Sequence, residues 1–417
     1  MAQNTLLICF DFPPNEGIGG RRWAKLAKGL AKLNTVVHVI KADPKKKNST
    51  SPWTAEVEDE NIHIHSLPRT YPEVVSDPGN GLLDKINYRI QRYLLKQKTK
   101  GTIYDVAIEW DKLLIPKALE VIDRENIANL IVTGAPFNLF PYAAEIKAQR
   151  PELKLLLDYR DPWLLAVNYG IPGLTYPRFL EEKFKQHKAL AAADFITCPN
   201  EFMLEEIKSS DDFRKIKGEY KVIPHFYDQD DINQYLVQSK PSPEKIKLVY
   251  GGTLYMGLEP WFKKLCEALD QVKASRPELY NRLQIDLFSK DLQFATWFEN
   301  HQEVIHLQTP IGKELFTKIT EANACFIFLA HHNKDYRTTK FFEILPFGKP
   351  LVYLGEKGFV SEFIEEKELG WVLHQPEIDF IQVLQELEND TFQASNQFDY
   401  KEFSLDKTSE MVEGWLL

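Results

Sequence analysis

The stretch from Ala324 to Tyr353, ACFIFLAHHNKDYRTTKFFEILPFGKPLVY, decides the fold of this chain. It opens with the uninterrupted apolar run Ala324–Leu329, which is typical of a parallel strand buried on both faces. After a polar loop, a hydroxyl side chain at Thr338 or Thr339 can cap a helix. Gly348 suits the left-handed position that ends a helix, and a second apolar run follows it. The stretch therefore predicts a strand, a polar loop, a short helix and another strand.

The polar loop and the start of this short helix form the first candidate binding site. Ligands bind at the carboxyl ends of the strands in open α/β sheets, and a helix N-terminus offers unpaired N–H groups with partial positive charge. Arg337 and Lys340 add positive charge there, so the site suits a diphosphate. Glu343 lies one turn further along, where its carboxylate could accept hydrogen bonds from ribose hydroxyls. The alternative is an ordinary capped helix with solvated charges.

The N-terminus predicts a second unit of the same kind. The apolar run Thr5–Phe10 indicates a buried strand, a helix follows from about Trp23, and Val36–Ile40 indicates the next strand. Gly19 and Gly20, just before this helix, let backbone N–H groups approach an anion. The pattern is a β-loop-α-β unit, which is half of a Rossmann-like domain.

The charged residues after these glycines have two interpretations. Arg21 or Arg22 could supply positive charge to the same anion, or could simply solvate the start of the helix. A dinucleotide-binding fingerprint fits poorly, because Gly17 and Gly19 are followed by Arg22 where the third glycine belongs. The loop is also long and contains two prolines.

Another polar group follows the apolar run 155–157, in the segment Asp158–Trp163, DYRDPW. Arg160 and Asp161 lie directly after this predicted strand. Acid and base residues at a strand end indicate a cleft. The alternative is that the two side chains pair with each other and brace the loop.

The second half of the chain opens with a strand and a glycine turn, Ile246–Tyr255. Gly252 lets the backbone approach a ligand, and the Thr253 hydroxyl could donate to a phosphate. The preceding residues 229–245 are polar and contain two prolines, which is typical of a linker.

Composition agrees with two soluble domains. The chain has 417 residues, 44% hydrophobic and 27% charged. Residues 1–230 carry 32 Lys+Arg and 31 Asp+Glu, whereas residues 231–417 carry 19 and 29, so charges of +1 and −10 give the net −9. No basic region dominates, which argues against nucleic-acid binding. The 4 cysteines form no CxxC pair, so we expect core cysteines and no metal site.

One predicted helix, Leu82–Lys96, is amphipathic, with basic residues between its apolar ones. Such a helix can lie on an anionic membrane surface, or can pack on its own domain with a solvated basic face. No run approaches the roughly 20 apolar residues of a membrane-spanning helix, and no cleavable leader is evident. We therefore expect a cytoplasmic protein, peripheral on the inner face of the membrane if this helix binds lipid.

These segments, in this order, resemble the nucleotide-sugar glycosyltransferases of the GT-B fold, in the retaining family 4 group and its Asp-x-Arg-Asp-Pro-Trp subfamily. The resemblance implies two Rossmann-like α/β domains that face each other across a cleft. It implies an acceptor domain at 1–225 joined by the tail 398–417, a linker at 226–245, and a donor domain at 246–397.

The resemblance also implies roles for the site residues. Glu343 would hold the donor ribose, and Thr339, Lys340 and Arg337 would meet the pyrophosphate. Gly252 and Thr253 would join them on the donor side. Across the cleft, donor phosphates and acceptor would meet Gly19, Gly20 and Arg21. Asp335, eight positions before Glu343, would meet sugar hydroxyls. The candidate catalytic residues are Asp335 and, on the acceptor side, Arg160 and Asp161.

The chain departs from the family pattern at several positions, and Asp335 is one of them, because relatives commonly have Glu there. Met256–Glu259 lacks the Lys or Arg that many relatives use for the pyrophosphate, and His225 stands where they have Asn. The expected function is sugar transfer from a UDP- or GDP-linked donor to a saccharide or lipid-linked acceptor, without a metal or other cofactor. The alternatives are a sugar-nucleotide epimerase of the same fold and a non-catalytic nucleotide-sugar-binding protein.

Overall fold

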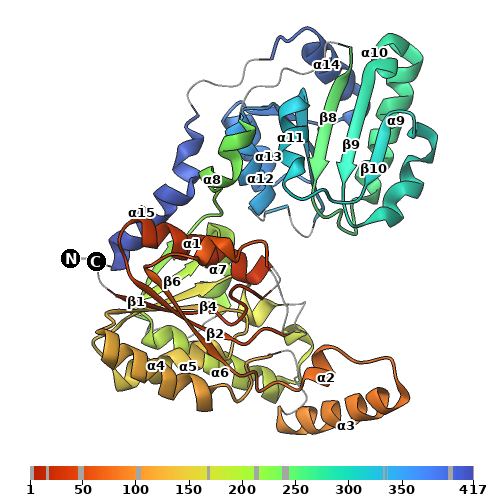
Figure 1. The fold of residues 1–417 in the computed structure, drawn as a ribbon. Helices are drawn as coiled ribbons and strands as arrows, with labels where there is room; N and C mark the ends of the chain where they lie inside the picture. Colours follow the sequence, from red (N-terminus) through yellow and green to blue (C-terminus); the bar gives the residue numbers. More distant parts are fainter. Residues whose placement is uncertain are drawn as a thin grey trace. The chain divides into compact units, whose positions relative to one another are not determined.

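The computed structural model describes residues 4–15, 18–45, 51–99, 105–166, 170–210, 216–236, 244–331, 334–335, 337–392 and 398–416. The chain forms two compact units (Figure 1). Unit 1 contains Met1–Pro224 and Leu405–Leu417, and unit 2 contains His225–Ser404.

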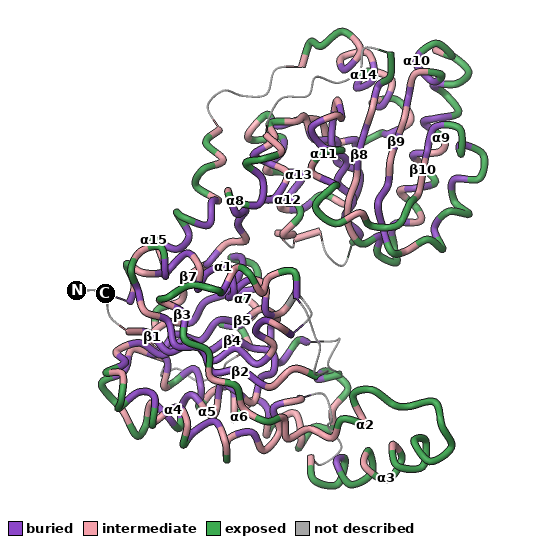
Figure 2. The backbone as a smooth tube through the Cα atoms, viewed as in Figure 1, coloured by how far each residue is buried: buried purple, intermediate pink, exposed green. Residues whose placement is uncertain are grey.

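Unit 1 is built on a parallel sheet of 7 strands in the order β3-β2-β1-β4-β5-β6-β7. The strands are β1 Thr5–Ile8, β2 Val37–Ala42, β3 Ile62–Leu67, β4 Asn129–Gly134, β5 Lys154–Tyr159, β6 Phe195–Cys198 and β7 Glu219–Val222. The helices are α1 Ile18–Lys32, α2 Glu73–Ser76, α3 Leu82–Lys98, α4 Asp111–Glu125, α5 Leu139–Gln149, α6 Tyr176–Ala192, α7 Glu201–Ser210 and α15 Leu405–Leu416. Figure 2 shows the central strands of this sheet buried.

Unit 2 is built on a parallel sheet of 6 strands in the order β10-β9-β8-β11-β12-β13. The strands are β8 Ile246–Gly251, β9 Leu283–Phe288, β10 Ile305–Gln308, β11 Ala324–Leu329, β12 Leu351–Gly355 and β13 Gly370–Val372. The helices are α8 Gln229–Ile232, α9 Glu259–Ser275, α10 Pro277–Arg282, α11 Glu314–Glu321, α12 Thr339–Ile344, α13 Phe359–Glu366 and α14 Pro376–Glu388.

The unbroken apolar run of β11 follows from its place inside the unit 2 sheet. Phe326 and Phe328 join one core cluster, whereas Cys325 and Ile327 point the other way into a second cluster. Successive side chains of a strand face opposite sides, so a strand with helices on both sides needs apolar residues at every position. The predicted buried strand is confirmed.

The remainder of the decisive stretch also has its predicted form. Thr338 is the N-cap of α12, a 3-10 turn continues the helix over Leu345–Phe347, and β12 follows. Gly348 ends the helical segment with φ 60° and ψ 20°, the left-handed conformation that glycine adopts at low cost.

The C-terminal helix α15 packs against α1 within unit 1. A Cβ on Gly29 would lie 1.9 Å from Ser409 Oγ, so the two helices approach closely because this residue has no side chain. Residues 398–404 belong to unit 2, where Tyr227 N donates to Phe403 O at 3.0 Å. Within the predicted linker 226–245, the structure forms α8 and a 3-10 turn, and 237–243 lie outside the described residues.

The cysteine prediction is tested directly. Cys9, Cys198 and Cys325 are buried and Cys266 is half-buried, all with free thiols. Burial raises the pKa of the Cys9, Cys198 and Cys325 thiols to about 12, so they stay protonated and behave as small core residues.

Candidate functional site

Each sheet contains one pair of neighbouring strands from which the chain continues toward opposite edges of the sheet, and we call this pair the reversal point. Candidate site residues predicted from the sequence lie near these two reversal points. In unit 2, β8 and β11 are neighbours, and the chain continues from them toward opposite edges of the sheet. In unit 1 the same reversal separates β1 from β4. Loops that leave such a pair of strands diverge and open a crevice at their carboxyl ends, where open α/β sheets bind ligands.

The loop after β11 leads into a capped helix start. Thr338 has extended backbone geometry, and its Oγ1 accepts a hydrogen bond from Phe341 N at 3.4 Å. Thr338 is therefore the cap that the sequence left undecided between two threonines. The Thr339 hydroxyl instead lies 3.5 Å from Nδ1 of His225, at the beginning of unit 2.

Glu343 lies one turn inside α12 and is only 5% exposed. Its Oε2 lies 3.3 Å from Nζ of Lys340, whose side chain is 56% exposed. A nearly buried carboxylate needs hydrogen-bond donors or a counter-charge, and this one has a cation that remains accessible to solvent. The arrangement can hold a hydroxyl-rich ligand at the carboxylate and an anionic one at the lysine.

Arg337 and Asp335 are positioned by the start of α13. The Arg337 guanidinium stacks on the Phe359 ring, 3.9 Å from its centroid. Asp335 Oδ1 lies 3.1 Å from where a Cβ on Gly358 would be, so its carboxylate is beside the N-terminus of α13. A helix N-terminus favours negative charge. Both side chains therefore lie against the start of α13.

The glycine turn after β8 is held by one backbone and one side-chain hydrogen bond. Gly252 N donates to Phe288 O at the end of β9 at 3.0 Å, and the Tyr250 hydroxyl donates to Thr253 O at 2.7 Å. A Cβ on Gly252 would lie 2.8 Å from that hydroxyl, so the Tyr250 side chain would have to shift for a larger residue. Thr253 is exposed, so its hydroxyl can reach a ligand.

In unit 1, the glycines at the start of α1 lie against residues distant in sequence. Nη1 of Arg160 lies 2.0 Å from where a Cβ on Gly19 would be, so the guanidinium passes directly over the helix start. A Cβ on Gly20 would lie 2.0 Å from the backbone oxygen of Asp11. Arg160 in turn donates to Gly134 O at 3.2 Å, at the end of β4. The structure thus brings Gly19, Gly20 and Arg160 together at the unit 1 reversal point.

The two arginines of α1 separate into different environments. Arg22 is buried and donates to Asp158 Oδ2 at 3.4 Å and to Ile223 O at 2.6 Å, so it braces the interior. Arg21 is partly exposed. Burial raises the pKa of Asp161, and the nearby Arg160 charge opposes that shift. A carboxyl with a raised pKa beside an arginine fits acid–base chemistry and also fits a braced loop.

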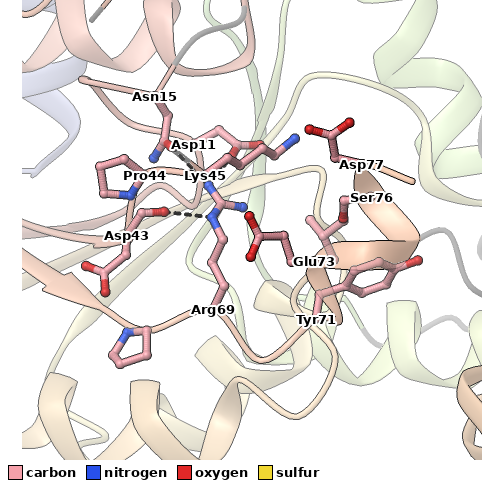
Figure 3. A pocket seen from close by; sticks show the side chains of 12 residues that line it. Asp11, Asn15, Asp43, Pro44, Lys45, Arg69, Tyr71, Glu73, Ser76 and Asp77 are labelled. Atoms are coloured by element: carbon pink, nitrogen blue, oxygen red, sulfur yellow. Dashed lines mark hydrogen bonds and ion pairs between the residues drawn. The ribbon is translucent and has the colours of Figure 1, made fainter. Parts of the chain in front are cut away.

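A pocket of about 550 Å³ in unit 1 is a feature that our sequence analysis missed (Figure 3). Arg69, after β3, is its central side chain: it donates to Asp43 O at 2.7 Å, to Asp11 Oδ1 at 3.0 Å and to Asn15 Oδ1 at 3.1 Å. Tyr71 and the α2 side chains line the other wall. Carboxylates, an amide, a phenol and cations around one cavity suit a polyhydroxylated ligand.

A single signal pointed to part of this pocket. Asp11 and Asn15 belong to the polar loop after the first strand, which the sequence places at a sheet edge. The sequence after β2 and β3 carries no comparable motif. Side chains from these two segments come together in the pocket because β3, β2 and β1 are neighbours in the sheet, and a sequence pattern does not display that order.

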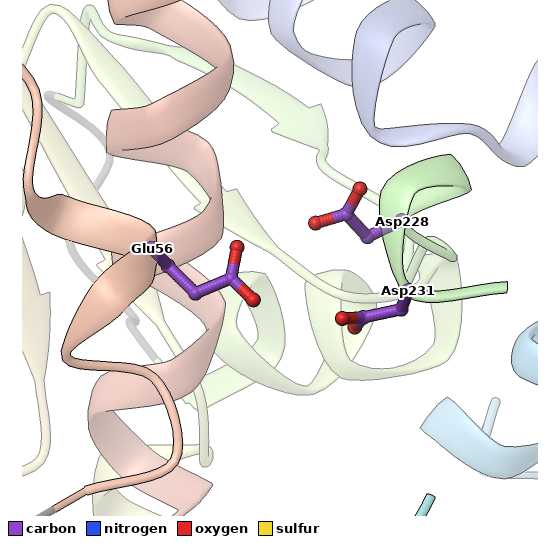
Figure 4. Close-up of side chains that lie close together, drawn as sticks. All are labelled: Glu56, Asp228 and Asp231. Carbon is purple, nitrogen blue, oxygen red and sulfur yellow. The ribbon is translucent and has the colours of Figure 1, made fainter. Parts of the chain in front are cut away.

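Three carboxylates drawn in Figure 4 have partners inside their own units. In unit 1, Glu56 pairs with Lys25 at 3.0 Å and with Lys28 at 2.9 Å. In unit 2, Asp228 accepts from Asp230 N at 3.0 Å as the cap of α8, and Asp231 pairs with Lys313 at 2.8 Å. Local pairing therefore accounts for the placement of each side chain.

Comparison with known proteins shows the fold. No family model and no curated protein matches the sequence. An E. coli trehalose-6-phosphate protein bound with UDP-2-fluoro glucose matches with TM-score 0.62 and 10% identity over 99% of this chain and 98% of that one. An α,α-trehalose-phosphate synthase (UDP-forming) from Burkholderia vietnamiensis matches with TM-score 0.59 and 10% identity over 99% of both chains.

A third similar structure has a different assignment. A protein assigned as a UDP-N-acetylglucosamine 2-epimerase from Listeria monocytogenes matches with TM-score 0.52 and 13% identity over 99% of this chain and 95% of that one. At such identities the similarity establishes architecture, and one fold supports several activities. The chain has the GT-B fold, with two Rossmann-like units.

Proposed function

We propose that this protein is a glycosyltransferase that moves a sugar from a nucleotide-linked donor to an acceptor. The observation that carries the proposal is Glu343, a nearly buried carboxylate one turn inside a capped helix, beside the reversal point of the unit 2 sheet. Its position suits ribose hydroxyls, while the N–H groups of the helix start and the Lys340 ammonium suit a diphosphate. The UDP-sugar complex among the similar structures supports this choice of ligand.

In the proposed reaction, unit 2 binds the donor through Gly252, Thr253 and the α12 residues. The bond between the sugar anomeric carbon and the diphosphate oxygen breaks, and an acceptor hydroxyl oxygen bonds to that carbon while its proton passes to the departing diphosphate. Negative charge develops on the departing diphosphate. Helix N–H groups, Lys340 and Arg337 would stabilise that charge, which is the main electrostatic requirement of the step.

The acceptor is assigned to unit 1. The polar pocket around Arg69 supplies the donors and acceptors that a saccharide needs, and an epimerase would not require such a second site. Arg160 and Asp161 are proposed to act on the acceptor side, with Gly19, Gly20 and Arg21, and Asp335 is proposed to meet the donor sugar. We further propose that the protein belongs to family 4, transfers the sugar with retention of configuration and uses a UDP- or GDP-linked donor. The proposed role is cell-surface glycan synthesis in the cytoplasm.

Thermal unfolding in the presence of UDP, GDP, ADP, CMP, NAD and the matching sugar conjugates tests the donor site. A ligand that binds only the folded protein raises its apparent stability. We expect one nucleoside diphosphate to raise the Tm of the wild type and of Glu362→Ala, an exposed control on α13, but not of Glu343→Ala. Stabilisation by NAD alone, or by nothing in the panel, would contradict the proposal.

Product analysis separates the two enzymatic candidates. With the stabilising sugar nucleotide and a saccharide acceptor, a transferase releases free nucleoside diphosphate in proportion to the new glycoside. An epimerase converts the sugar nucleotide to its epimer without any acceptor. Formation of the epimer would replace the transferase assignment.

A further inference from the structure

Helix α3 contacts its own unit along only one edge. Leu95 is its buried residue, and Tyr88 and Gln91 are partly buried. These three positions are spaced by three and four residues, so they share one face of the helix. Figure 1 shows α3 at the periphery of unit 1, away from the strands, and Figure 2 shows most of its length exposed.

The larger apolar face of α3 points away from that edge. Six of the 17 large exposed hydrophobic side chains among the described residues belong to this one helix. They are Leu82 (76% exposed), Leu83 (80%), Ile86 (47%), Ile90 (52%), Tyr93 (62%) and Leu94 (54%). At 100° per residue they form a continuous apolar arc, which we call the α3 apolar face. Isolated exposed apolar residues are ordinary, but a contiguous set of this size indicates a binding surface.

A row of basic side chains borders the α3 apolar face. Lys85, Arg89, Arg92 and Lys96 follow one another at helical spacing and are exposed. Arg92 lies over the Tyr88 ring, 5.8 Å from its centroid, and Lys98 pairs with Glu109. Lys85, Arg89 and Lys96 pair with no carboxylate among the residues that the structure describes.

The charge of α3 is opposite to that of the whole protein. Residues 82–98 contain five Lys or Arg and one Asp, a net charge of +4, in a chain of net charge −9. A second copy of the chain docked face to face would bring two such basic rows together, which is electrostatically unfavourable. An anionic lipid surface complements both features at once, because it accepts apolar side chains between headgroups and attracts the basic row.

We propose that α3 docks the protein on an anionic lipid bilayer, with the α3 apolar face inserted at the headgroup level. None of the described helices is long and apolar enough to cross a membrane, so this contact would be peripheral. The charge row orients an otherwise acidic protein on the bilayer. Docking does not depend on the proposed sugar transfer.

The docking element also adjoins the unit 1 pocket. α2 supplies Glu73 and Ser76 to the pocket wall and packs on α3. Burial raises the pKa of the Tyr71 phenol in the pocket, and the Arg92 charge on α3 opposes that shift. Docking would therefore bring the pocket close to the lipid headgroups. If the proposed function holds, this placement favours an acceptor carried on a lipid.

Co-sedimentation of the full chain with vesicles tests the docking. Vesicles of phosphatidylcholine alone are compared with vesicles that also contain phosphatidylglycerol. We expect wild-type protein to sediment with the anionic vesicles and to be released by salt. Arg89→Glu with Lys96→Glu should weaken partitioning by roughly tenfold or more, since each basic residue near an anionic surface contributes a factor of about five. Leu83→Glu with Ile90→Glu should abolish it.

Ile378→Glu is the matched control, because Ile378 is 62% exposed on α14 of unit 2. It should sediment like the wild type, and circular dichroism should show all variants folded with unchanged Tm. The proposal would be overturned if the wild type bound neutral and anionic vesicles equally, or did not bind anionic vesicles. It would also be overturned if Ile378→Glu lost as much vesicle binding as the α3 variants. A concentration-dependent dimer in sedimentation velocity that the α3 variants dissociate would overturn it too. None of these measurements uses activity, so a failed sugar-transfer assay leaves their outcome intact.

Discussion

Replacing Glu343 by Gln should remove ribose recognition while leaving unit 2 folded. The side chain is 5% exposed, and Gln has almost the same volume, so no cavity forms. The ion pair with Lys340 spans 3.3 Å but involves a lysine that is 56% exposed, so its loss costs under about 1 kcal/mol of folding free energy. The principal loss should therefore appear in ligand binding.

The expected magnitude follows from the hydrogen bonds that a carboxylate accepts. A hydrogen bond to a charged group contributes about 1.5–3 kcal/mol. Since every 1.4 kcal/mol is tenfold in affinity, the Kd of the nucleoside diphosphate should rise roughly 10- to 150-fold in Glu343→Gln. The diphosphate contacts of the helix start should be unchanged.

Isothermal titration calorimetry with the stabilising nucleoside diphosphate and its 2′,3′-dideoxy analogue isolates the contact. Wild-type protein should discriminate against the dideoxy analogue by the same factor, and Glu343→Gln should bind the two ligands almost equally. Glu362→Gln, on the exposed side of α13, should behave like wild type. Persistent discrimination in the Glu343 variant, or an equal loss for both ligands, would refute the assignment of this carboxylate to the ribose.

Three further predictions concern unit 1. Gly20→Ala would place a Cβ 2.0 Å from the Asp11 backbone oxygen, so chemical denaturation should show unit 1 destabilised by about 1–3 kcal/mol; an unchanged midpoint would contradict the close approach. Burial raises the pKa of Asp105 from 3.8 to about 6, so the stability of wild type relative to Asp105→Asn should fall as pH rises from 3.8 to about 6, and a difference flat with pH would contradict this. Arg69→Ala should raise the KM for the acceptor in transfer assays at least several-fold and leave nucleotide Kd unchanged, whereas weakened nucleotide binding would move Arg69 out of the acceptor site.

Local rules in the sequence were enough to specify the decisive segment of unit 2. A short apolar run without interruption is typical of a strand covered on both faces, and β11 is such a strand. The left-handed Gly348 ends the helical segment because a residue without Cβ adopts that conformation at little cost. Rules of this kind depend on neighbours within a few residues, and a sequence displays those directly.

Tertiary structure alone decided which distant side chains meet. Gly19 lies under Arg160 because β1, β4 and β5 are consecutive in the sheet, although about 140 residues separate the two positions. Arg69 reaches Asp11 only because β3, β2 and β1 are consecutive in strand order. No local pattern encodes that order, so the sequence indicated the loop of Asp11 and Asn15 but not the pocket that this loop helps to form.

The helix α3 shows the same division within one element. The spacing of its apolar and basic residues determined that it is amphipathic, because helical periodicity is a local property. Which face of α3 is buried depends on the elements of unit 1 that pack against this helix. Unit 1 covers Tyr88, Gln91 and Leu95 and leaves the α3 apolar face exposed, since only the narrow edge of the helix meets a neighbouring element.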